Sequence, residues 1–445
     1  MLSSRTIENK DRNKYHEATK HSAISVQIDP NYVDATTQPA AFKRYPKFFR
    51  RFPLELNNPL HRFLSLTSAI TFQKQYRDGI HSLRVQPSAG ALYPTEIYVQ
   101  IRGINGMLDG IYHLEPDSRS IALIYELIDD GLEGYFSDDR PIKGCIFLVS
   151  CVYFRSSWKY KNRSLRYCFL DSGHHLGAIE AAACVSSYPY QLLFDFDRLA
   201  LNDDLGFENK EFVAAVAIAG KAKDNKSVRK LRSPLPFVAA TDYFEPNLFI
   251  EEGCKQTWVK NPEKQPIQVP KFPFESKRML QAIQRRRSAR KFHPSSIGLD
   301  DFLTVCNAMQ QPISSENAAA FEIYAAVQRV TGMQSGIYQI GGGGNYCLKQ
   351  GDFHDRAGYL CINQAIARDS AVVFFVVSDC RNYQVALQQA GLVGQRIYLA
   401  ATYLNFGCSG IGAFFDDETQ AFLETDLNVL YAIAIGNLFD RDRIN

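Results

Sequence analysis

The chain of 445 residues lacks most features that mark membrane, secreted or nucleic-acid-binding proteins. No apolar run approaches the ~20 residues of a membrane span, and the polar stretch 1–30 has no signal-peptide core. Ten cysteines occur singly, without a C-x-x-C pair, which argues against a zinc site and predicts free thiols in a reducing compartment. Fifty basic and 47 acidic residues leave a net charge of +3, so no nucleic acid or membrane partner is implied. We therefore expect a cytoplasmic protein.

An internal repeat is the most informative feature that is present. Glu96-Ile97-Tyr98, Gly106-Met107 and Gly110-Ile111-Tyr112 recur 226 residues later, between Glu322 and Tyr338, without a gap. The offset then rises to 228 near residue 149 and falls to 218 along the helical stretch 173–183. The second copy therefore lacks ten residues at the place where the first copy has Trp158-Lys159-Tyr160.

Each copy is predicted to fold as an α+β unit of one sheet with helices, and the two units to pack about a pseudo-two-fold axis. Residues 221–274 are rich in Pro and Lys and are expected to form a surface crossover. The predicted strands are 96–101, 145–151, 212–219, 321–327, 371–377 and 430–435, and the predicted long helices are 176–185 and 385–404. The expected divisions are a loose polar arm (1–44), a first domain (45–220), a linker (221–277) and a second domain (278–445).

The loop from Pro87 to Pro94 precedes the first predicted strand. Its small residues Ser88, Ala89 and Gly90 would let a ligand approach backbone N–H groups and a hydroxyl closely. An ordinary Pro/Gly turn is the alternative interpretation. The second copy has a different sequence at this place, 313–320, so the two loops are not expected to act identically.

A basic run, 285–290, opens the second copy. Arg287 and Arg290 could bind a phosphomonoester through their guanidinium groups, with Ser288 adding a hydroxyl, although a solvated basic run would look the same. The first copy has Lys47-Phe48-Phe49 at the matching place, which predicts a poor anion site.

Two further segments carry candidate functional residues. Gly410, Ile411 and Gly412 follow the second long helix and would allow close backbone approach to a planar ring. Lys159 and Tyr160 lie in the segment unique to the first copy. A lysine whose pKa is lowered by burial or by neighbouring cations can remove a proton, but a plain surface loop is the alternative.

Taken together, these motifs resemble the SagB-type azoline dehydrogenases, FMN-dependent members of the nitroreductase-like superfamily that form thiazoles and oxazoles in ribosomal peptides. The resemblance covers about residues 45–220 and 278–443. It rests on Leu83-Arg84 to Pro94 with Glu96-Ile97-Tyr98, Gly110-Ile111-Tyr112-His113, Lys159-Tyr160, Arg166-Tyr167, Arg286-Arg287-Ser288-x-Arg290 and Gly391-x-x-Gly394-Gln395 through Gly412.

The resemblance implies two nitroreductase-like domains in an intramolecular pseudo-dimer, with FMN at their interface. It implies that the cofactor is bound by Arg287, Ser288, Arg290, Gly410, Ile411, Gly412, Arg441 and Arg443 of the second half and by Pro87, Ser88, Ala89 and Gly90 of the first. Only this pairing of halves is intact, so we expect one FMN per chain. The other pairing, Lys47-Phe48-Phe49 facing Glu316-Asn317, would be dead or repurposed.

The resemblance also implies the reaction: FMN takes a hydride from a thiazoline or oxazoline ring while Lys159, with Tyr160 as partner, removes a ring proton, and oxygen reoxidises the flavin. Two alternatives stay open. An NAD(P)H-dependent nitro or quinone reductase of the same fold would not need Lys159, and a non-catalytic scaffold would be colourless.

The expected partners are a small heterocycle or peptide substrate and a cyclodehydratase that supplies it. No recognisable leader-peptide-binding domain precedes the repeat, so we expect peptide delivery to rely on another protein. No metal site is expected.

Overall fold

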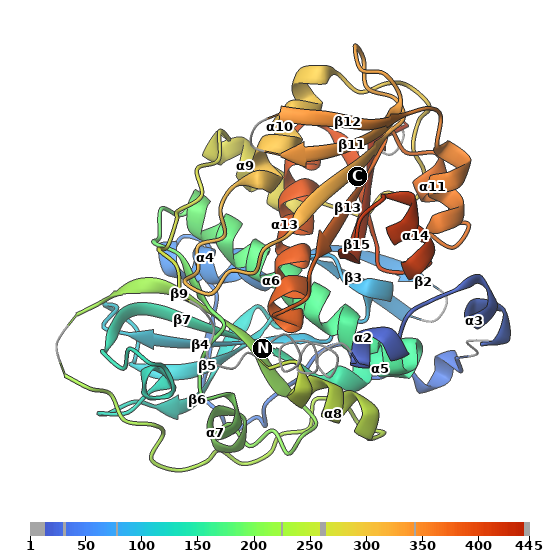
Figure 1. The fold of residues 1–445 in the computed structure, drawn as a ribbon. Helices are drawn as coiled ribbons and strands as arrows, with labels where there is room; N and C mark the ends of the chain where they lie inside the picture. The colour runs from blue at the N-terminus through green and yellow to red at the C-terminus, as the bar shows by residue number, and fades with distance from the viewer. Residues whose placement is uncertain are drawn as a thin grey trace, which may run out of the picture.

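The computed structural model describes residues 14–29, 33–76, 79–223, 226–258, 264–341 and 344–439. Two antiparallel sheets dominate the fold, one in each half of the chain (Figure 1). The first sheet consists, in spatial order, of β1 (Arg51–Pro53), β6 (Ser120–Glu126), β5 (Gly110–Glu115), β4 (Thr95–Arg102), β7 (Ile142–Cys151), β9 (Phe212–Ala222) and β8 (Gln191–Leu193).

The second sheet repeats the order of the first, apart from the extra edge strand β1. It consists of β12 (Gly344–Gln350), β11 (Gly336–Gly341), β10 (Glu322–Val327), β13 (Val372–Ser378), β15 (Asn428–Asn437) and β14 (Phe406–Ile411). All six strands predicted from β-branched and aromatic runs are confirmed as β4, β7, β9, β10, β13 and β15. The expected α+β class with sheets and helices is therefore correct.

Two long helices, α6 (Ser164–Val185) and α13 (Tyr383–Tyr403), lie side by side between the sheets (Figure 1). They touch through glycines: a methyl group on Gly173 would overlap the backbone oxygen of Gln388, and one on Gly391 would overlap that of Leu170. These two contacts are reciprocal. Gly391 lies 218 residues after Gly173, and Gln388 lies 218 residues after Leu170, so each contact joins the counterparts of the residues in the other. Such reciprocity is what a two-fold axis between two related halves would produce, so it agrees with the predicted pseudo-dimer, which stays a prediction.

Both faces of the central strands are buried, whereas the edge strand β12 is largely exposed. In β13, Val372, Phe374 and Val376 join the central core with α13, whereas the alternating Val373 and Phe375 join an outer core. The outer faces are covered by short helices and loops. The remaining helices are α2 (Lys14–Ala18), α3 (Ala23–Ile28), α4 (Pro59–Ser68), α5 (Tyr153–Tyr160), α7 (Arg198–Asp204), α8 (Leu248–Gln256), α9 (Ser276–Arg285), α10 (Leu299–Gln310), α11 (His354–Leu360), α12 (Ala365–Arg368) and α14 (Asp416–Phe422).

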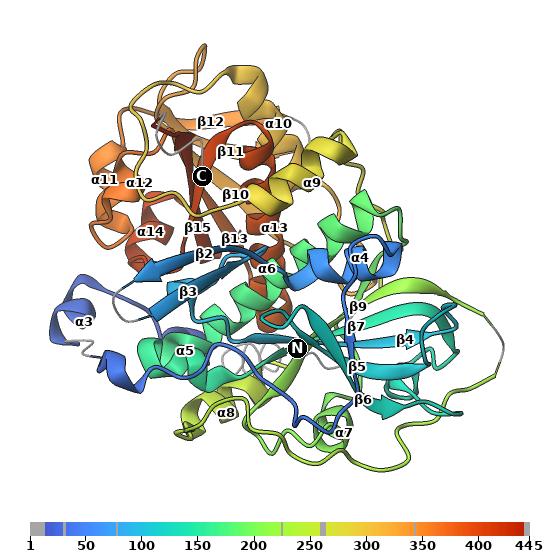
Figure 2. The ribbon, with the colours of Figure 1, turned by 180° about the vertical axis from the view of Figure 1, so that it is seen from behind.

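A two-stranded hairpin, β2 (Ile70–Tyr76) and β3 (Gly79–Arg84), interrupts the first half just before the Pro87 loop. Figure 2 shows it between α5 and the second sheet. The second half has only a short connection, 311–321, at the corresponding place. The sequence did not predict this hairpin, whose strands are rich in polar residues.

The prediction of a loose N-terminal arm is wrong for helix α2 and for the segment around Lys43. Tyr15 and His16 on α2 are buried, and Arg166 donates to the backbone oxygen of His16 at 2.6 Å. Further along, Lys43 is buried in an ion pair of 2.7 Å with Glu211. These two parts of the arm are thus packed, whereas α3 between them has no buried residue.

Two sequence-level expectations about helices also need correction. The first long helix begins at Ser164 and not near 176, and the predicted surface crossover, for which no helix was predicted, contains α8. Among the described residues, no helix is long and apolar enough to cross a membrane. Eight of the ten cysteines are buried and all ten are free thiols.

Candidate functional site

The loop after Pro87 forms a tight 3₁₀ turn that is fixed to α6. Pro87 is buried, whereas Gly90 is exposed and has a φ of 61°, in the left-handed region that favours glycine. Ser88 Oγ donates to Asp171 Oδ2 at 2.5 Å, and the backbone N–H of Ala89 donates to Asp171 Oδ1 at 3.2 Å. Ser88 Oγ also accepts from Tyr93 N at 2.9 Å. The turn is therefore rigid at its base and open at Gly90.

Lys159 and Tyr160, the predicted catalytic pair, end helix α5 and face this turn. A methyl group on Gly90 would lie 2.7 Å from the Tyr160 hydroxyl and 3.3 Å from Lys159 Nζ. Both side chains are half-buried, so the alternative of a plain surface loop does not describe them. Burial, Tyr167 and Asp171 raise the pKa of Tyr160, so its hydroxyl stays protonated at neutral pH.

The start of the second half joins the Pro87 loop through Arg286. Its Nε donates to Val85 O at 2.8 Å and its Nη2 to Arg84 O at 2.9 Å, whereas its buried Nη1 has no hydrogen-bond partner. Burial lowers the pKa of Arg286. The sequence motif included Arg286, but the predicted binding residues did not.

Arg287, predicted as a phosphate ligand, lies against the hairpin instead of projecting freely. Its guanidinium donates to Thr71 Oγ1 at 2.9 Å and to Thr71 O at 2.7 Å. Burial and the neighbouring Arg286 lower its pKa to about 10. Arg290 is exposed. Across the described ranges, neither Arg286 nor Arg287 has a carboxylate partner, so this corner carries uncompensated positive charge.

Ser288 and the predicted glycine segment meet at one tyrosine. Ser288 Oγ lies 2.9 Å from the Tyr398 hydroxyl, and that hydroxyl accepts from Gly410 N at 2.7 Å. A side chain on Gly410 would overlap the Tyr431 hydroxyl, and Ile411 is buried.

Gly412 is covered by a tyrosine of the first half: a side chain there would overlap the Tyr167 ring. Tyr167 in turn lies 4.3 Å, centroid to centroid, from Tyr160. A continuous line of contacts thus runs from Gly412 through these two rings to Gly90. At both Gly410 and Gly412 the space is filled by the chain's own tyrosines, which explains the glycines by packing.

The structure therefore brings most predicted site residues together, from both halves of the chain. Arg441 and Arg443 lie outside the described residues. Reasoning from the sequence missed Asp171 and Tyr431, and it interpreted His174 as a cap or packing residue at a helix start, although Tyr167, Asp171 and His174 follow the i, i+4, i+7 spacing of one helix face. His174 Nε2 lies 2.8 Å from the Tyr431 hydroxyl, and burial lowers the pKa of His174 to about 3, so it is neutral.

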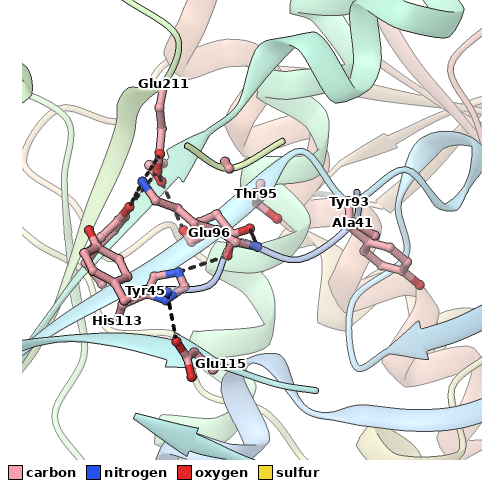
Figure 3. A network of polar contacts seen from close by, with 12 residues as sticks. Ala41, Tyr45, Tyr93, Thr95, Glu96, His113, Glu115 and Glu211 are labelled. Carbon is pink, nitrogen blue, oxygen red and sulfur yellow. Dashed lines mark hydrogen bonds and ion pairs between the residues drawn. The ribbon is translucent and has the colours of Figure 1, made fainter. Parts of the chain in front are cut away.

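A buried polar network holds α5, and with it Lys159, in place (Figure 3). At its centre, Glu96 lies 2.6 Å from Arg155 on α5 and 3.2 Å from His113. Arg155 also donates to Tyr93 O at 3.0 Å, at the end of the Pro87 loop. Burial alone would raise the pKa of Glu96, but Arg155 and His113 outweigh it and hold that pKa well below its usual range. The network thus fixes the helix and the loop relative to each other.

The second interface between the halves is built differently. Ala319 N donates to Gln389 at 3.2 Å, as Ala89 does to Asp171, and Gln389 is Asp171 shifted by 218. Arg396 forms a buried bidentate pair with Glu180, at 2.8 and 2.7 Å. This interface therefore has its buried charges paired.

The predicted partners at that second interface have other neighbours. Phe49 packs on Tyr45 with ring centroids 5.2 Å apart, and Phe48 is 82% exposed. Glu316 pairs with Lys264 of the crossover at 3.2 Å. Within the described ranges no contact between these two segments is seen, so their role at the second interface stays a prediction.

Comparisons with known proteins agree with this fold. Residues 283–437 match the model of the nitroreductase family. A solved structure described as a "putative nitroreductase" from Anabaena variabilis superposes with a TM-score of 0.78 at 26% identity, covering 96% of this chain and 99% of that one. A protein of Methanocaldococcus jannaschii named a "putative nitroreductase" is 35% identical over 94 residues, 20% of this chain and 46% of that protein.

The chain thus spans about half the length of the curated relative that it matches, and nearly all of the solved structure. Together the three findings support a place in the nitroreductase-like superfamily. Members of this family are oxidoreductases that generally bind a flavin.

A phosphate-bearing flavin fits the residues that are present. Arg286 offers a buried N–H without an acceptor, Arg287 adds a second cation, and the two lack acidic partners within the described ranges. Gly90 is exposed, and the Tyr160 hydroxyl and Lys159 Nζ lie close to the position that a side chain on it would take. The two arginines suit an anion such as the phosphate of a flavin.

Proposed function

We propose that the protein is an FMN-dependent oxidoreductase whose single flavin site lies between two nitroreductase-like halves, arranged as an intramolecular pseudo-dimer. One observation carries this proposal. Arg286, at the start of the second half, is hydrogen-bonded to the backbone that leads directly into the Pro87 loop of the first half. The common strand order and the reciprocal glycine contacts support the pseudo-dimer.

The residues expected to bind FMN come from both halves. Arg286, Arg287, Ser288 and Arg290, with Arg441 and Arg443, would hold the phosphate and ribityl chain, whereas Pro87, Ser88, Ala89, Gly90, Gly410, Ile411 and Gly412 would enclose the ring. For Gly410 and Gly412 to contact the ring, the Tyr431 and Tyr167 side chains that fill the space beside them would have to move. When bound, FMN supplies a two-electron acceptor. For Arg287 to reach a phosphate, its bonds to Thr71 must be exchanged for bonds to the anion.

We further propose that the substrate is a thiazoline or oxazoline ring, which loses two hydrogens to become aromatic. Lys159 would remove the ring proton, since its amine faces the open side of the Gly90 turn and has no ion-pair partner among the described residues. Tyr160, protonated at neutral pH, would orient the substrate by donating a hydrogen bond.

Reduction of a nitro compound or quinone by NAD(P)H is the second candidate. The name of the solved relative that matches over its whole length favours it. Such a reaction gives Lys159 no proton to remove from carbon, so the two candidates differ in their dependence on this residue.

The first experiment is an absorption spectrum of the purified protein with a flavin-to-protein ratio. We expect a yellow protein with a ratio near one. A ratio near two would contradict the single composite site, and a colourless protein that binds no added FMN would favour a non-catalytic scaffold.

The second experiment compares Lys159→Met with Lys161→Met, which removes an exposed lysine paired with Asp29. We expect Lys159→Met to lower kcat for azoline oxidation by about 100-fold or more without loss of flavin, because general base catalysis is worth roughly that much. Lys161→Met should act as wild type. If both variants keep full azoline oxidation, or if only NAD(P)H-dependent reduction is found, the azoline proposal is wrong.

A further inference from the structure

Asp171 is a buried carboxyl that the proposed chemistry does not use. It lies on α6, is 4% exposed, and accepts hydrogen bonds from Ser88 Oγ at 2.5 Å and from Ala89 N at 3.2 Å. No cation lies within ion-pair distance of it among the described residues. Two hydrogen bonds from the Ser88–Gly90 turn are therefore its compensation for burial.

The groups that face Asp171 are neutral at pH 7. They are Cys151 on β7, Tyr160 on α5 and Tyr431 on β15, and burial, followed by neighbours that include Asp171, raises the pKa of each. Among cations, Lys159 lies beside the same turn: its Nζ would be 3.3 Å from a methyl group on Gly90. On α6 itself, burial lowers the pKa of His174 and His175 to about 3.

Burial therefore dominates the titration of Asp171. It raises the pKa of this carboxyl to about 7, against the opposing effect of the hydrogen bonds from Ser88 and Ala89. A group with this pKa changes its charge within the range where enzymes work, whereas the neighbouring tyrosines and histidines do not.

The other half of the molecule makes the same contact without a titratable group. Gln389, the counterpart of Asp171 on α13, accepts from Ala319 N at 3.2 Å. An amide is thus sufficient to dock the loop on the helix. At this position of the helix, a carboxyl group in place of the amide occurs only in the half that also has Lys159 and Tyr160.

We propose that Asp171 is a positioning residue that holds the Ser88–Gly90 turn against Lys159 and Tyr160 in its ionised form and loosens it when protonated. Its effect on the turn stands alone, whereas its effect on catalysis rests on the proposed flavin-dependent function.

The hydrogen-bond pattern explains the change. Ser88 Oγ accepts from Tyr93 N and donates its own proton to Asp171. If Asp171 Oδ2 were protonated, its O–H and the Ser88 O–H would point at each other, because both groups would be donors along the same line. The Ser88 proton would then have to turn to another acceptor. Because Gly90 is in contact range of Lys159 Nζ and the Tyr160 hydroxyl, a shift of the turn changes the surroundings of both groups.

The test follows the carbonyl stretch of protonated carboxyl groups by infrared difference spectroscopy of the full-length protein, titrated from about pH 5 to about pH 9 around the expected pKa. Wild type should show one buried carboxyl with a midpoint near pH 7, and Asp171→Asn should lack it. Ser88→Ala removes a donor to the ionised form, so it should move the midpoint upward by about one unit. An identical band in wild type and Asp171→Asn would overturn the proposal.

The kinetic arm measures the pH profile of kcat/KM. We expect a limb near pH 7 in wild type that is absent in Asp171→Asn, displaced upward in Ser88→Ala and restored in Asp171→Glu. Gln389→Glu, which adds a carboxyl to the other half, is the matched control and should keep the wild-type profile. An unchanged limb in Asp171→Asn would contradict a positioning role.

The two proposals can fail separately. If the protein binds no flavin but the infrared titration follows Asp171, the proposed function fails and the conformational effect of Asp171 stands. If flavin binds and turnover occurs while the pH profile ignores Asp171, the inference fails and the proposed function stands.

Discussion

The two interfaces between the halves share a plan but differ in how their buried charges are satisfied. At the first, Asp171 holds the loop and Arg286 keeps an unsatisfied N–H. At the second, Gln389 holds the loop and Arg396 is paired with Glu180. Gln389 Nε2 at the second interface also lacks a hydrogen-bond partner, so unsatisfied polar atoms occur at both. The difference is that the atom at the first interface belongs to an arginine without a carboxylate partner among the described residues, and an unsatisfied charged group costs more than a neutral one. We therefore expect an anionic ligand at the first interface.

The residue that corresponds to Glu180 in the other half also differs in charge. Shifted by 218, it is Tyr398, whose hydroxyl connects Ser288 and Gly410 in the proposed flavin site. An ion pair in one half thus corresponds to a neutral hydrogen-bonding tyrosine in the other. The carboxylate of Glu180 satisfies the charge of Arg396, whereas the neutral Tyr398 leaves the charge of the arginines near it without a carboxylate partner in the described part of the chain.

Arg396→Ala should give the largest effect on stability. It leaves Glu180 buried without its cation, which should lower the free energy of unfolding by about 4 kcal/mol. Denaturant unfolding measures this loss. The flavin-to-protein ratio of the folded fraction should not change, and a loss of flavin with unchanged stability would contradict the assignment of the two interfaces.

Gly391→Ala should be next, because its methyl group would overlap Leu170 O where α6 and α13 cross. We expect a loss of about 3 kcal/mol in the same unfolding assay, as is typical of overpacking. Gly341→Ala is the control, since a methyl group there meets nothing nearer than 3.8 Å. Equal stability of the two variants would mean that the helices do not require a glycine at this crossing.

Arg286→Ala should act mainly on the cofactor. We expect the dissociation constant for FMN to rise about 100-fold, or about 2.7 kcal/mol, because a charged hydrogen bond to the anion is lost. Fluorescence titration of the flavin-free protein with FMN measures it. An unchanged dissociation constant would mean that FMN does not bind at Arg286, and the unpaired arginine would then no longer distinguish the two interfaces.

Asp171→Asn should change how stability depends on pH. Because the pKa of Asp171 is raised to about 7 in the folded protein, its contribution is fully present below the unfolded pKa and is lost as pH rises toward and through 7. Between about pH 5 and pH 8 wild type should therefore lose about 2 kcal/mol relative to the variant. Parallel pH profiles of unfolding for the two proteins would refute this.

The sequence predicted the sheets well because their central strands consist of β-branched and aromatic residues with clear boundaries. It placed the start of the first long helix too late. The turns between 164 and 175 carry Arg166, Asp171, His174 and His175, polar residues that are buried in the fold, so their polarity hid a buried helix. Burial of polar groups depends on partners that are distant in sequence, which periodicity cannot show.

From the sequence we could predict which segments come together at the candidate site, but not which contacts their side chains make. The repeat pointed to one loop and one basic run from opposite halves, because complementary gaps in two copies are visible in the letters alone. Arg286 does contact the backbone that leads into that loop, but a shared cofactor site there stays a prediction. That Arg286 rather than Arg287 would face inward could not be predicted, because it depends on the hairpin β2–β3, where Thr71 binds Arg287. Likewise, Gly410 and Gly412 are required by Tyr431 and Tyr167, which lie far away in sequence.

The glycine crossing of α6 and α13 has a consequence for how the molecule behaves on dilution. A site shared by two separate chains falls apart once their concentration drops below the dissociation constant of the dimer. Here the covalent crossover keeps both contributors in one molecule, so their encounter is intramolecular. Any activity that resides at this junction should therefore be first order in protein down to the lowest concentrations that can be assayed.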